Sequence, residues 1–156
     1  GYVLFVITLH WGYTLLSGAI TLAIMILPLI MRTTEEALKA VPDSFREGSF
    51  GLGAGRLRTI FRIILPSAMP GILAGIILAI GRIVGETAAL MYTAGTVTKV
   101  AGGLFDSGRT LAYHMYNLAS EGFYTDQAFA TAVVLLVIVM IINWISGRVA
   151  KKLTKA

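Results

Sequence analysis

Cysteine is absent from the 156 residues, which excludes disulfides and thiolate metal sites. Charge is scarce as well: only 13% of the residues are charged, against ~25% in a typical soluble domain. Hydrophobic residues make up 56% of the chain. This composition predicts a membrane protein. Because no basic low-complexity tail accompanies the net charge of +5, we expect no nucleic-acid partner and explain that charge by membrane topology.

Motifs for nucleotide binding and for hydrolysis are missing too. A phosphate-binding loop needs Gly-Lys-Ser or Gly-Lys-Thr, whereas Gly55 is followed by Arg56 and Leu57. The chain has no His-Glu-x-x-His and no Gly-x-Ser-x-Gly sequence. Its histidines, His10 and His114, are isolated, and we expect each to be a packed or interfacial residue and not a metal ligand. The sequence therefore predicts no catalytic residue, no cofactor and no metal in this chain.

Three apolar runs reach the ~20 residues that are needed to cross a bilayer. They are residues 13–31, 66–92 and 127–145. A shorter run, 1–10, is closed by the interfacial aromatics Trp11 and Tyr13. We interpret 1–12 as the tail of a truncated helix, and the chain, which begins with Gly1, as a fragment starting inside a helix. The predicted fold class is all-α, with several transmembrane helices.

Basic residues are distributed unevenly among the connecting segments. Residues 32–65 carry six: Arg32, Lys39, Arg46, Arg56, Arg58 and Arg62. The C-terminal tail carries four: Arg148, Lys151, Lys152 and Lys155. Residues 93–126 carry only Lys99 and Arg109. Since basic segments resist translocation, we expect 32–65 and the C-terminus to be cytoplasmic and 93–126 to be an extracytoplasmic loop.

Local signals divide residues 32–65 into short helices. Thr33 with Glu36, and Ser44 with Glu47, have the spacing of capping boxes. Pro42 is expected to end the first helix, and Asp43 or Ser44 to begin the next.

Glycines and a proline are expected to shape the rest of this loop. Gly51, Gly53 and Gly55 would allow a reversal with positive φ. A third helix is expected over 56–64, closed by Pro66, with its apolar residues at helical spacing: Leu57, Ile60, Phe61 and Ile64. Such a hairpin has no chemistry of its own. It is suited to docking a partner, although a purely structural hairpin is the alternative interpretation.

Two charges, Arg82 and Glu86, fall at membrane depth in the run 66–92. Projected as one helix, the run places both on a stripe with Gly71, Gly75 and Gly85. Two small-xxx-small patterns, Gly71 with Gly75 and Gly81 with Gly85, permit close helix contact on or beside this stripe. One interpretation is that each charge merely neutralises the other. Because such a pair rarely repays its desolvation, we favour a polar constriction in a translocation path. A guanidinium fork suits an oxyanion, and a carboxylate favours one that still carries a proton.

Other features concern the segments that flank the last span. A short surface helix is expected over 109–120, with apolar residues and one histidine at helical spacing: Leu111, His114, Met115 and Leu118. Thr125 or Asp126 would cap the last helix. Trp144 would lie at its cytoplasmic interface.

The loop from Glu47 to Pro66 resembles the docking loop of ABC-transporter permeases. It has a Glu followed by two small residues, then a Gly, then Ile-x-Leu-Pro at 63–66. It departs from the family in having Gly48-Ser49 where Ala-Ala is usual. The resemblance implies that a hairpin here docks on a separate ATPase through Glu47, Gly48, Ser49, Gly53, Ile63, Leu65 and Pro66.

Longer stretches narrow this resemblance. Residues 30–38, 41–44 and 81–88 are similar to the PstA-type permease subunit of bacterial phosphate importers, and the similarity extends through 113–116 and 123–124. It covers the whole chain but only about the C-terminal half of such a subunit. The resemblance implies a type I ABC importer permease fold, a multi-pass place in the bacterial inner membrane, and a path for inorganic phosphate lined by Arg82 and Glu86.

The same resemblance implies several partners. These are a second homologous permease subunit, two ATPase subunits that bind the ATP, an extracytoplasmic phosphate-binding protein, and membrane lipid. Two alternatives stay open: a permease for another oxyanion or solute, and an ion channel or intramembrane enzyme. An enzyme would need a nucleophile with a base, or two acids, at membrane depth, and only the Arg82 and Glu86 pair is present there.

Overall fold

The computed structural model describes residues 1–154, which contain helices and no strand. Three helices in this range are long and apolar enough to cross a membrane: Leu15–Lys39, Arg56–Val84 and Thr125–Lys152. The predicted all-α class is thus confirmed, and the three helices overlap the three predicted spans. Lys155 of the basic tail lies outside the described residues. The chain divides into two compact units, Gly1–Ile26 with Gly81–Ile142 and Leu27–Ile80 with Asn143–Ala156.

In the unit built on Leu27–Ile80, helix α1 (Leu15–Lys39) continues well past Met31. The Thr33 hydroxyl donates back to the carbonyls of Leu29 and Ile30, at 3.0 and 3.2 Å, and so caps nothing. Glu36 pairs with Arg32 at 3.0 Å, one turn earlier. The capping box predicted at Thr33 and Glu36 is therefore wrong. Pairs of opposite charge four residues apart favour continuing the helix.

Helix α2 (Asp43–Gly51) begins at Asp43, directly after Pro42, as predicted. The second capping box is also wrong, because Ser44 lies inside the helix and the N-cap, Pro42, has no side-chain hydrogen bond. The reversal that follows needs only one residue with positive φ, Gly53 at +79°. Gly51 is still helical, and Gly55 has a φ of −71°.

Pro66 does not separate two helices. Helix α3 (Arg56–Thr59), the π-helical turn η2 (Ile60–Ile64) and α4 (Leu65–Val84) follow one another without interruption. The Leu65 N–H donates to the carbonyl of Ile60, five residues back. Proline lacks an N–H, and its ring crowds the carbonyl four residues earlier. A widened turn immediately before Pro66 relieves that crowding, so the helix continues.

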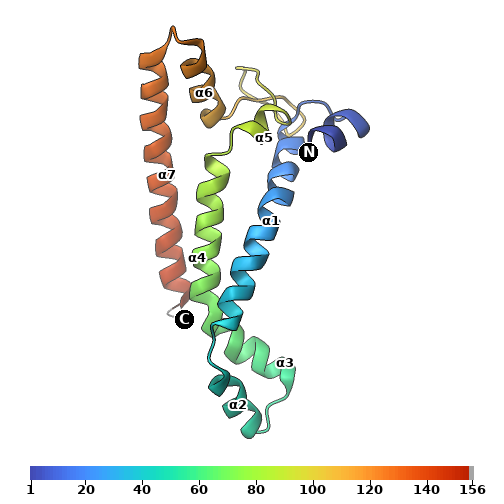
Figure 1. Cartoon of the computed structure of the whole chain (residues 1–156), viewed down its shortest axis with the longest axis vertical. Coiled ribbons are helices and arrows are strands. Elements are labelled where there is room, and N and C mark those ends of the chain that lie inside the picture. Colours follow the sequence, from blue (N-terminus) through green and yellow to red (C-terminus); the bar gives the residue numbers. More distant parts are fainter. Residues whose placement is uncertain (155–156) are drawn as a thin grey trace. The chain divides into compact units, whose positions relative to one another are not determined.

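Helices α1 and α4 pack closely in this unit, where they lie side by side (Figure 1). A Cβ atom added to Gly71 would lie 2.8 Å from the Cβ of Ala37, and one added to Gly75 would lie 2.4 Å from the Thr33 hydroxyl. Both distances are shorter than real contacts allow, so the helices can approach this closely only with glycine. The predicted close contact at Gly71 and Gly75 is confirmed, whereas Gly81 and Gly85 meet no second helix in the part of the chain that the structure describes.

We expect Gly75→Ala to lower the melting temperature of the purified full-length permease, because the Thr33 side chain must move to admit a methyl group. Gly81→Ala is the matched control: it makes the same change in the same helix, with no atom within 4 Å of the added Cβ. Without a steric penalty, it should gain up to ~1 kcal/mol of helix propensity. Equal melting temperatures for the two variants would contradict the close packing of α1 on α4.

The other unit contains α5 (Ala88–Met91), α6 (Leu111–Glu121), the π-helical turn η1 (Tyr2–Thr8) and most of α7 (Thr125–Thr154). The predicted span 66–92 is not continuous, because α4 ends at Val84 and α5 begins at Ala88. The Glu86 N–H donates to the carbonyl of Ile83 at 3.1 Å. Its carboxylate accepts from the N–H of Ala89 at 3.3 Å. Glu86 is thus hydrogen-bonded to the last turn of α4 and to the first turn of α5.

The segment 93–110 is hydrogen-bonded to the beginning of α1. The N–H groups of Thr14, Leu15 and Leu16 donate to the carbonyls of Thr93, Asp106 and Leu104, at 2.9 to 3.0 Å. The Thr14 hydroxyl accepts from the N–H of Ser17 at 3.2 Å. These bonds occupy the amides that the first turn of a helix leaves without partners. The segment is therefore attached to α1 along its backbone.

Near the start of α1, small residues bring another element of this unit close. A Cβ atom added to Gly18 would lie 2.8 Å from the Cβ of Ala94. Next to that contact, Leu22, Leu90 and Ala94 form a buried apolar cluster. The loop after α5 is thus packed against α1 as well as hydrogen-bonded to it.

Residues 1–12, interpreted from sequence as a helix tail, contain η1, which ends at Thr8. His10, with a φ of +53°, lies in the turn between η1 and α1.

The expected surface helix is confirmed as α6, which Thr110 caps by accepting from the N–H of Tyr113 at 3.3 Å. Thr125 and Asp126 are the first two residues of α7, so neither is its N-cap.

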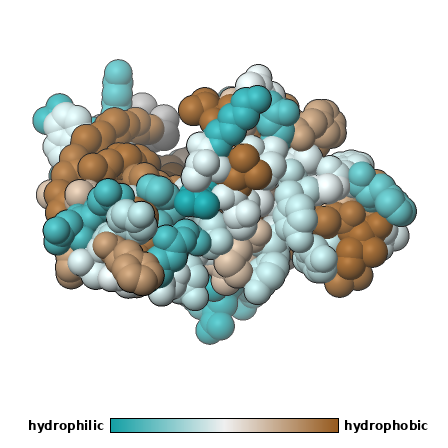
Figure 2. All heavy atoms as spheres, turned by 90° about the horizontal axis from the view of Figure 1, so that it is seen from above, coloured by the Kyte–Doolittle hydropathy of each residue, from teal (hydrophilic) through white to brown (hydrophobic). Residues whose placement is uncertain are grey.

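Apolar side chains on α7 are largely exposed in this chain, among them Phe129, Leu136 and Met140. Such a surface suits lipid or a partner helix. The view from above shows hydrophobic patches between hydrophilic side chains (Figure 2).

Candidate functional site

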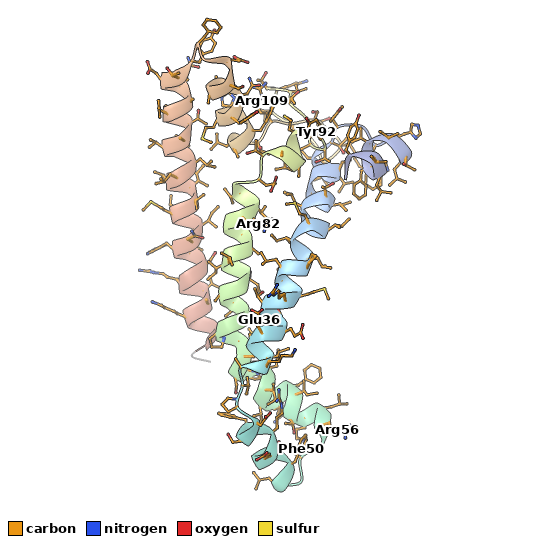
Figure 3. All side chains as sticks on the ribbon, viewed as in Figure 1. Glu36, Phe50, Arg56, Arg82, Tyr92 and Arg109 are labelled. Carbon is orange, nitrogen blue, oxygen red and sulfur yellow. The ribbon has the colours of Figure 1, made fainter. Side chains whose placement is uncertain are left out.

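Arg82 lies on the last turn of α4, immediately before the break in the apolar span. Figure 3 shows Arg82 on α4. Its side chain is exposed, and it makes no hydrogen bond or ion pair with any residue that the structure describes. A cation on the last turn of a helix is favourably placed toward the helix dipole. The position thus stabilises the charge while leaving all five guanidinium N–H donors available.

Glu86 is half-buried in the break and does not pair with Arg82. The ion pairs within residues 1–154 are Arg32 with Glu36, Lys39 with Glu35, and Arg46 with Asp43. The expectation that Arg82 and Glu86 share one helical stripe is wrong, because the helix ends between them. The interpretation that Arg82 and Glu86 neutralise each other is therefore wrong as well. Interrupted membrane helices leave backbone groups at the break, a feature of binding sites in transporters.

Residues 43–64 form a second candidate site, which we call the hairpin. The Ser49 and Thr59 hydroxyls share a buried hydrogen bond of 2.8 Å, and Thr59 also donates to the carbonyl of Gly55 at 3.2 Å. Ser49, expected from the family resemblance to face the ATPase, is 5% exposed and faces inward. It ties α2 to α3.

The remaining predicted docking residues divide into two groups. Glu47, Gly48, Gly53 and Pro66 are exposed. Ile63 and Leu65 are half-buried, and Ile63 packs against the buried cluster of Val41, Ile64 and Ala68. Arg46 joins α2 to the end of α1, since it donates to the carbonyl of Leu38 at 3.3 Å as well as pairing with Asp43. Of the seven predicted docking residues, four are thus exposed, whereas Ser49, Ile63 and Leu65 are buried or half-buried.

The hairpin also exposes large apolar side chains that were not among the predicted docking residues. We call them the apolar hairpin set: Phe45, Phe50, Leu52, Leu57, Ile60 and Phe61. Leu52 is 91% exposed, Leu57 72% and Phe61 64%. Phe50 and Arg56 both lie toward the tip of the hairpin (Figure 3). The available sequence signal was the apolar spacing on 56–64, which predicts a helix face but does not say whether that face is covered.

We expect the hydrogen bond between Ser49 and Thr59 to contribute about 1 kcal/mol to the local stability of the hairpin. In the full-length protein, Ser49→Ala should speed amide hydrogen exchange over 43–64. Thr59→Val should do the same, and the double variant should cost less than the sum of the single variants because the two hydroxyls act on each other. Strict additivity would show that the two hydroxyls do not interact.

Comparison with known proteins places these features in context. Residues 2–155 match the family described as "Binding-protein-dependent transport system inner membrane component". The chain is 36% identical over 174 residues to the "Probable ABC transporter permease protein YqgI" of Bacillus subtilis, covering 99% of this chain and 59% of that protein.

Two other relatives are described as phosphate permeases. The "Phosphate transport system permease protein PstA 2" of Mycobacterium bovis is 36% identical over 159 residues, covering 95% of this chain and 53% of that protein. The "Phosphate transport system permease protein PstA" of Xylella fastidiosa is 35% identical over 144 residues, 91% of this chain and 50% of that protein. The PstA-type resemblance is confirmed, and the chain spans about half the length of these relatives. No solved structure matches it.

Proposed function

Since the chain belongs to the family of binding-protein-dependent transport system inner membrane components, we propose that it forms about half of a permease subunit whose cargo is inorganic phosphate. Support for the cargo comes from the two relatives that are described as phosphate transport permeases. Support for the path comes from Arg82. We propose that a second homologous permease subunit supplies the rest of the path.

The observation that carries this proposal is an exposed guanidinium without a partner at a break in a membrane-spanning helix. An ionisable group at membrane depth is costly, and it usually faces a water-filled cavity or a substrate. The planar fork of Arg82 matches two oxygens of a tetrahedral oxyanion. One oxygen of Glu86 accepts from the N–H of Ala89, which leaves the other free to accept a hydrogen bond from the O–H of a partly protonated phosphate.

The hairpin supports coupling to a separate ATPase. Its apolar set is exposed in this chain, and burying one such aromatic or aliphatic side chain is worth about 1.5–3 kcal/mol. Glu47 and Gly53 are exposed beside it. We propose that two ATPase subunits bind and hydrolyse the ATP, and that the one facing this hairpin covers the apolar set. On this arrangement, 32–65 and the C-terminus are cytoplasmic, and the extracytoplasmic phosphate-binding protein meets the opposite side.

For the path, Arg82→Gln should abolish phosphate uptake by the assembled importer in membrane vesicles while leaving the ATPase subunits bound. Arg82→Lys should retain partial uptake, because it keeps the charge but loses the fork. Uptake of phosphate at the normal rate by the Gln variant would contradict a role for Arg82 in the path.

For the hairpin, Phe61→Ser should reduce the amount of ATPase that copurifies with the permease by about tenfold or more, since the buried apolar area is lost. Phe105→Ser is the matched control. Phe105 is 67% exposed, close to the 64% of Phe61, but lies in the segment 93–110. Equal ATPase recovery in the two variants would argue against docking through the apolar hairpin set.

The two alternatives make different predictions for the same vesicles. A permease for another oxyanion would prefer sulfate or molybdate over phosphate when their binding proteins are supplied. A channel would pass its ion without ATP. The unpaired Arg82 favours an anion but does not choose among oxyanions, so phosphate rests on the relatives.

A further inference from the structure

A cavity of about 300 Å³ lies in the unit that contains α5 and α6. Neither Arg82, Glu86 nor any residue of the hairpin lines it. Thr98, Arg109, Leu111 and His114 line it. Three of these four side chains are polar, and none is a carboxylate. Its chemistry can be derived from the hydrogen bonds of Arg109.

Arg109 is held from three directions. Its Nε donates to the carbonyl of Thr96 at 2.9 Å. Its guanidinium lies over the ring of Tyr113, 5.6 Å from the centroid, and its Nη1 is 3.3 Å from Nδ1 of His114. Figure 3 shows Arg109 beside α6. The cation is therefore positioned by its surroundings before any ligand arrives, which lowers the entropy cost of binding.

The contact with His114 determines which ring nitrogen carries the proton. A guanidinium can only donate, so Nδ1 of His114 must accept. In the neutral imidazole the proton then resides on Nε2, which becomes a donor. Arg109 thereby fixes the tautomer of a residue on the cavity wall.

The cavity wall thus offers hydrogen-bond donors and a positive charge. Arg109 has Nη2 without a partner among the described residues, His114 has its Nε2–H, and the Thr98 hydroxyl makes no hydrogen bond within 1–154. We propose that this cavity is a second oxyanion site, separate from Arg82, that binds inorganic phosphate. The choice of phosphate rests on the proposed function, whereas the donor set alone requires only a tetrahedral oxyanion. The volume equals that of about ten waters, so the ion enters with part of its hydration shell.

Equilibrium dialysis of radiolabelled inorganic phosphate against the purified full-length importer, without binding protein, tests the site directly. All samples carry Arg82→Gln, which removes the path as a binding site. The added change Arg109→Gln should weaken phosphate binding at least tenfold, because a positive charge and its charge-assisted hydrogen bond are lost. Lys99→Gln is the matched control: it removes one positive charge from the same segment but does not line the cavity, and it should change binding less than twofold.

A further variant guards against a merely structural role of Arg109 in holding Thr96 and His114. Thr98→Val leaves every contact of Arg109 in place and should still weaken binding about threefold. The proposal is overturned if Arg109→Gln and Lys99→Gln bind phosphate alike, or if Thr98→Val binds as tightly as its parent. If the importer proves to carry sulfate, repeating the dialysis with sulfate should give the same order of variants. In that case phosphate as the cargo fails and the cavity stands.

Discussion

Backbone polar groups in an apolar chain must find partners, and that constraint shapes every part of this structure. Lipid offers no hydrogen bonds, so spans are helices whose N–H and C=O groups pair within the segment. Where a helix cannot do this alone, a specific local solution is present. The π-helical turn before Pro66 keeps α3 and α4 continuous. At the beginning of α1, backbone N–H groups donate hydrogen bonds to carbonyls of the segment 93–110.

At the break after Val84, the same constraint shapes the surroundings of the proposed transport path. Glu86 makes a hydrogen bond on each side of the break: its N–H donates to the carbonyl of Ile83, and its carboxylate accepts from the N–H of Ala89. Among the described residues, Arg82 consequently has no acidic partner, and it lies on a helix end that suits a cation. The proposed path would use such a group, because its position stabilises the charge while its N–H donors can still bind an ion.

Polar side chains play opposite parts in the two units. In the hairpin, Ser49 and Thr59 satisfy each other and are buried, so they stabilise and do not recognise. In the other unit, Arg109 of the segment 93–110 orients the ring of His114 on α6. Its Nη2 still has N–H groups without a partner among the described residues. Burial and partners, more than residue type, thus separate a structural polar group from a binding one.

The sequence by itself determined the all-α class, the number of spans, the hairpin and the family. These follow from local properties: span length, helical spacing, and glycine and proline positions. Even the close contact at Gly71 and Gly75 was visible, because a small residue every fourth position marks one helix face. Four of the seven candidate docking residues are exposed, including Glu47 and Gly53, but their docking role stays a prediction.

Only the tertiary structure decided where helices end and which side chains stay free. The predicted capping boxes are wrong because both residues lie inside helices. Thr33 is within α1, where Glu36 pairs with Arg32, and Ser44 follows Asp43, the first residue of α2. The break that parts Arg82 from Glu86, the inward turn of Ser49 and the cavity beside Arg109 all depend on groups distant in sequence or on competing local bonds. The spacing of residues along the chain cannot tell which of several possible hydrogen bonds and contacts will form. That choice depends on burial and geometry, which exist only once the chain has folded.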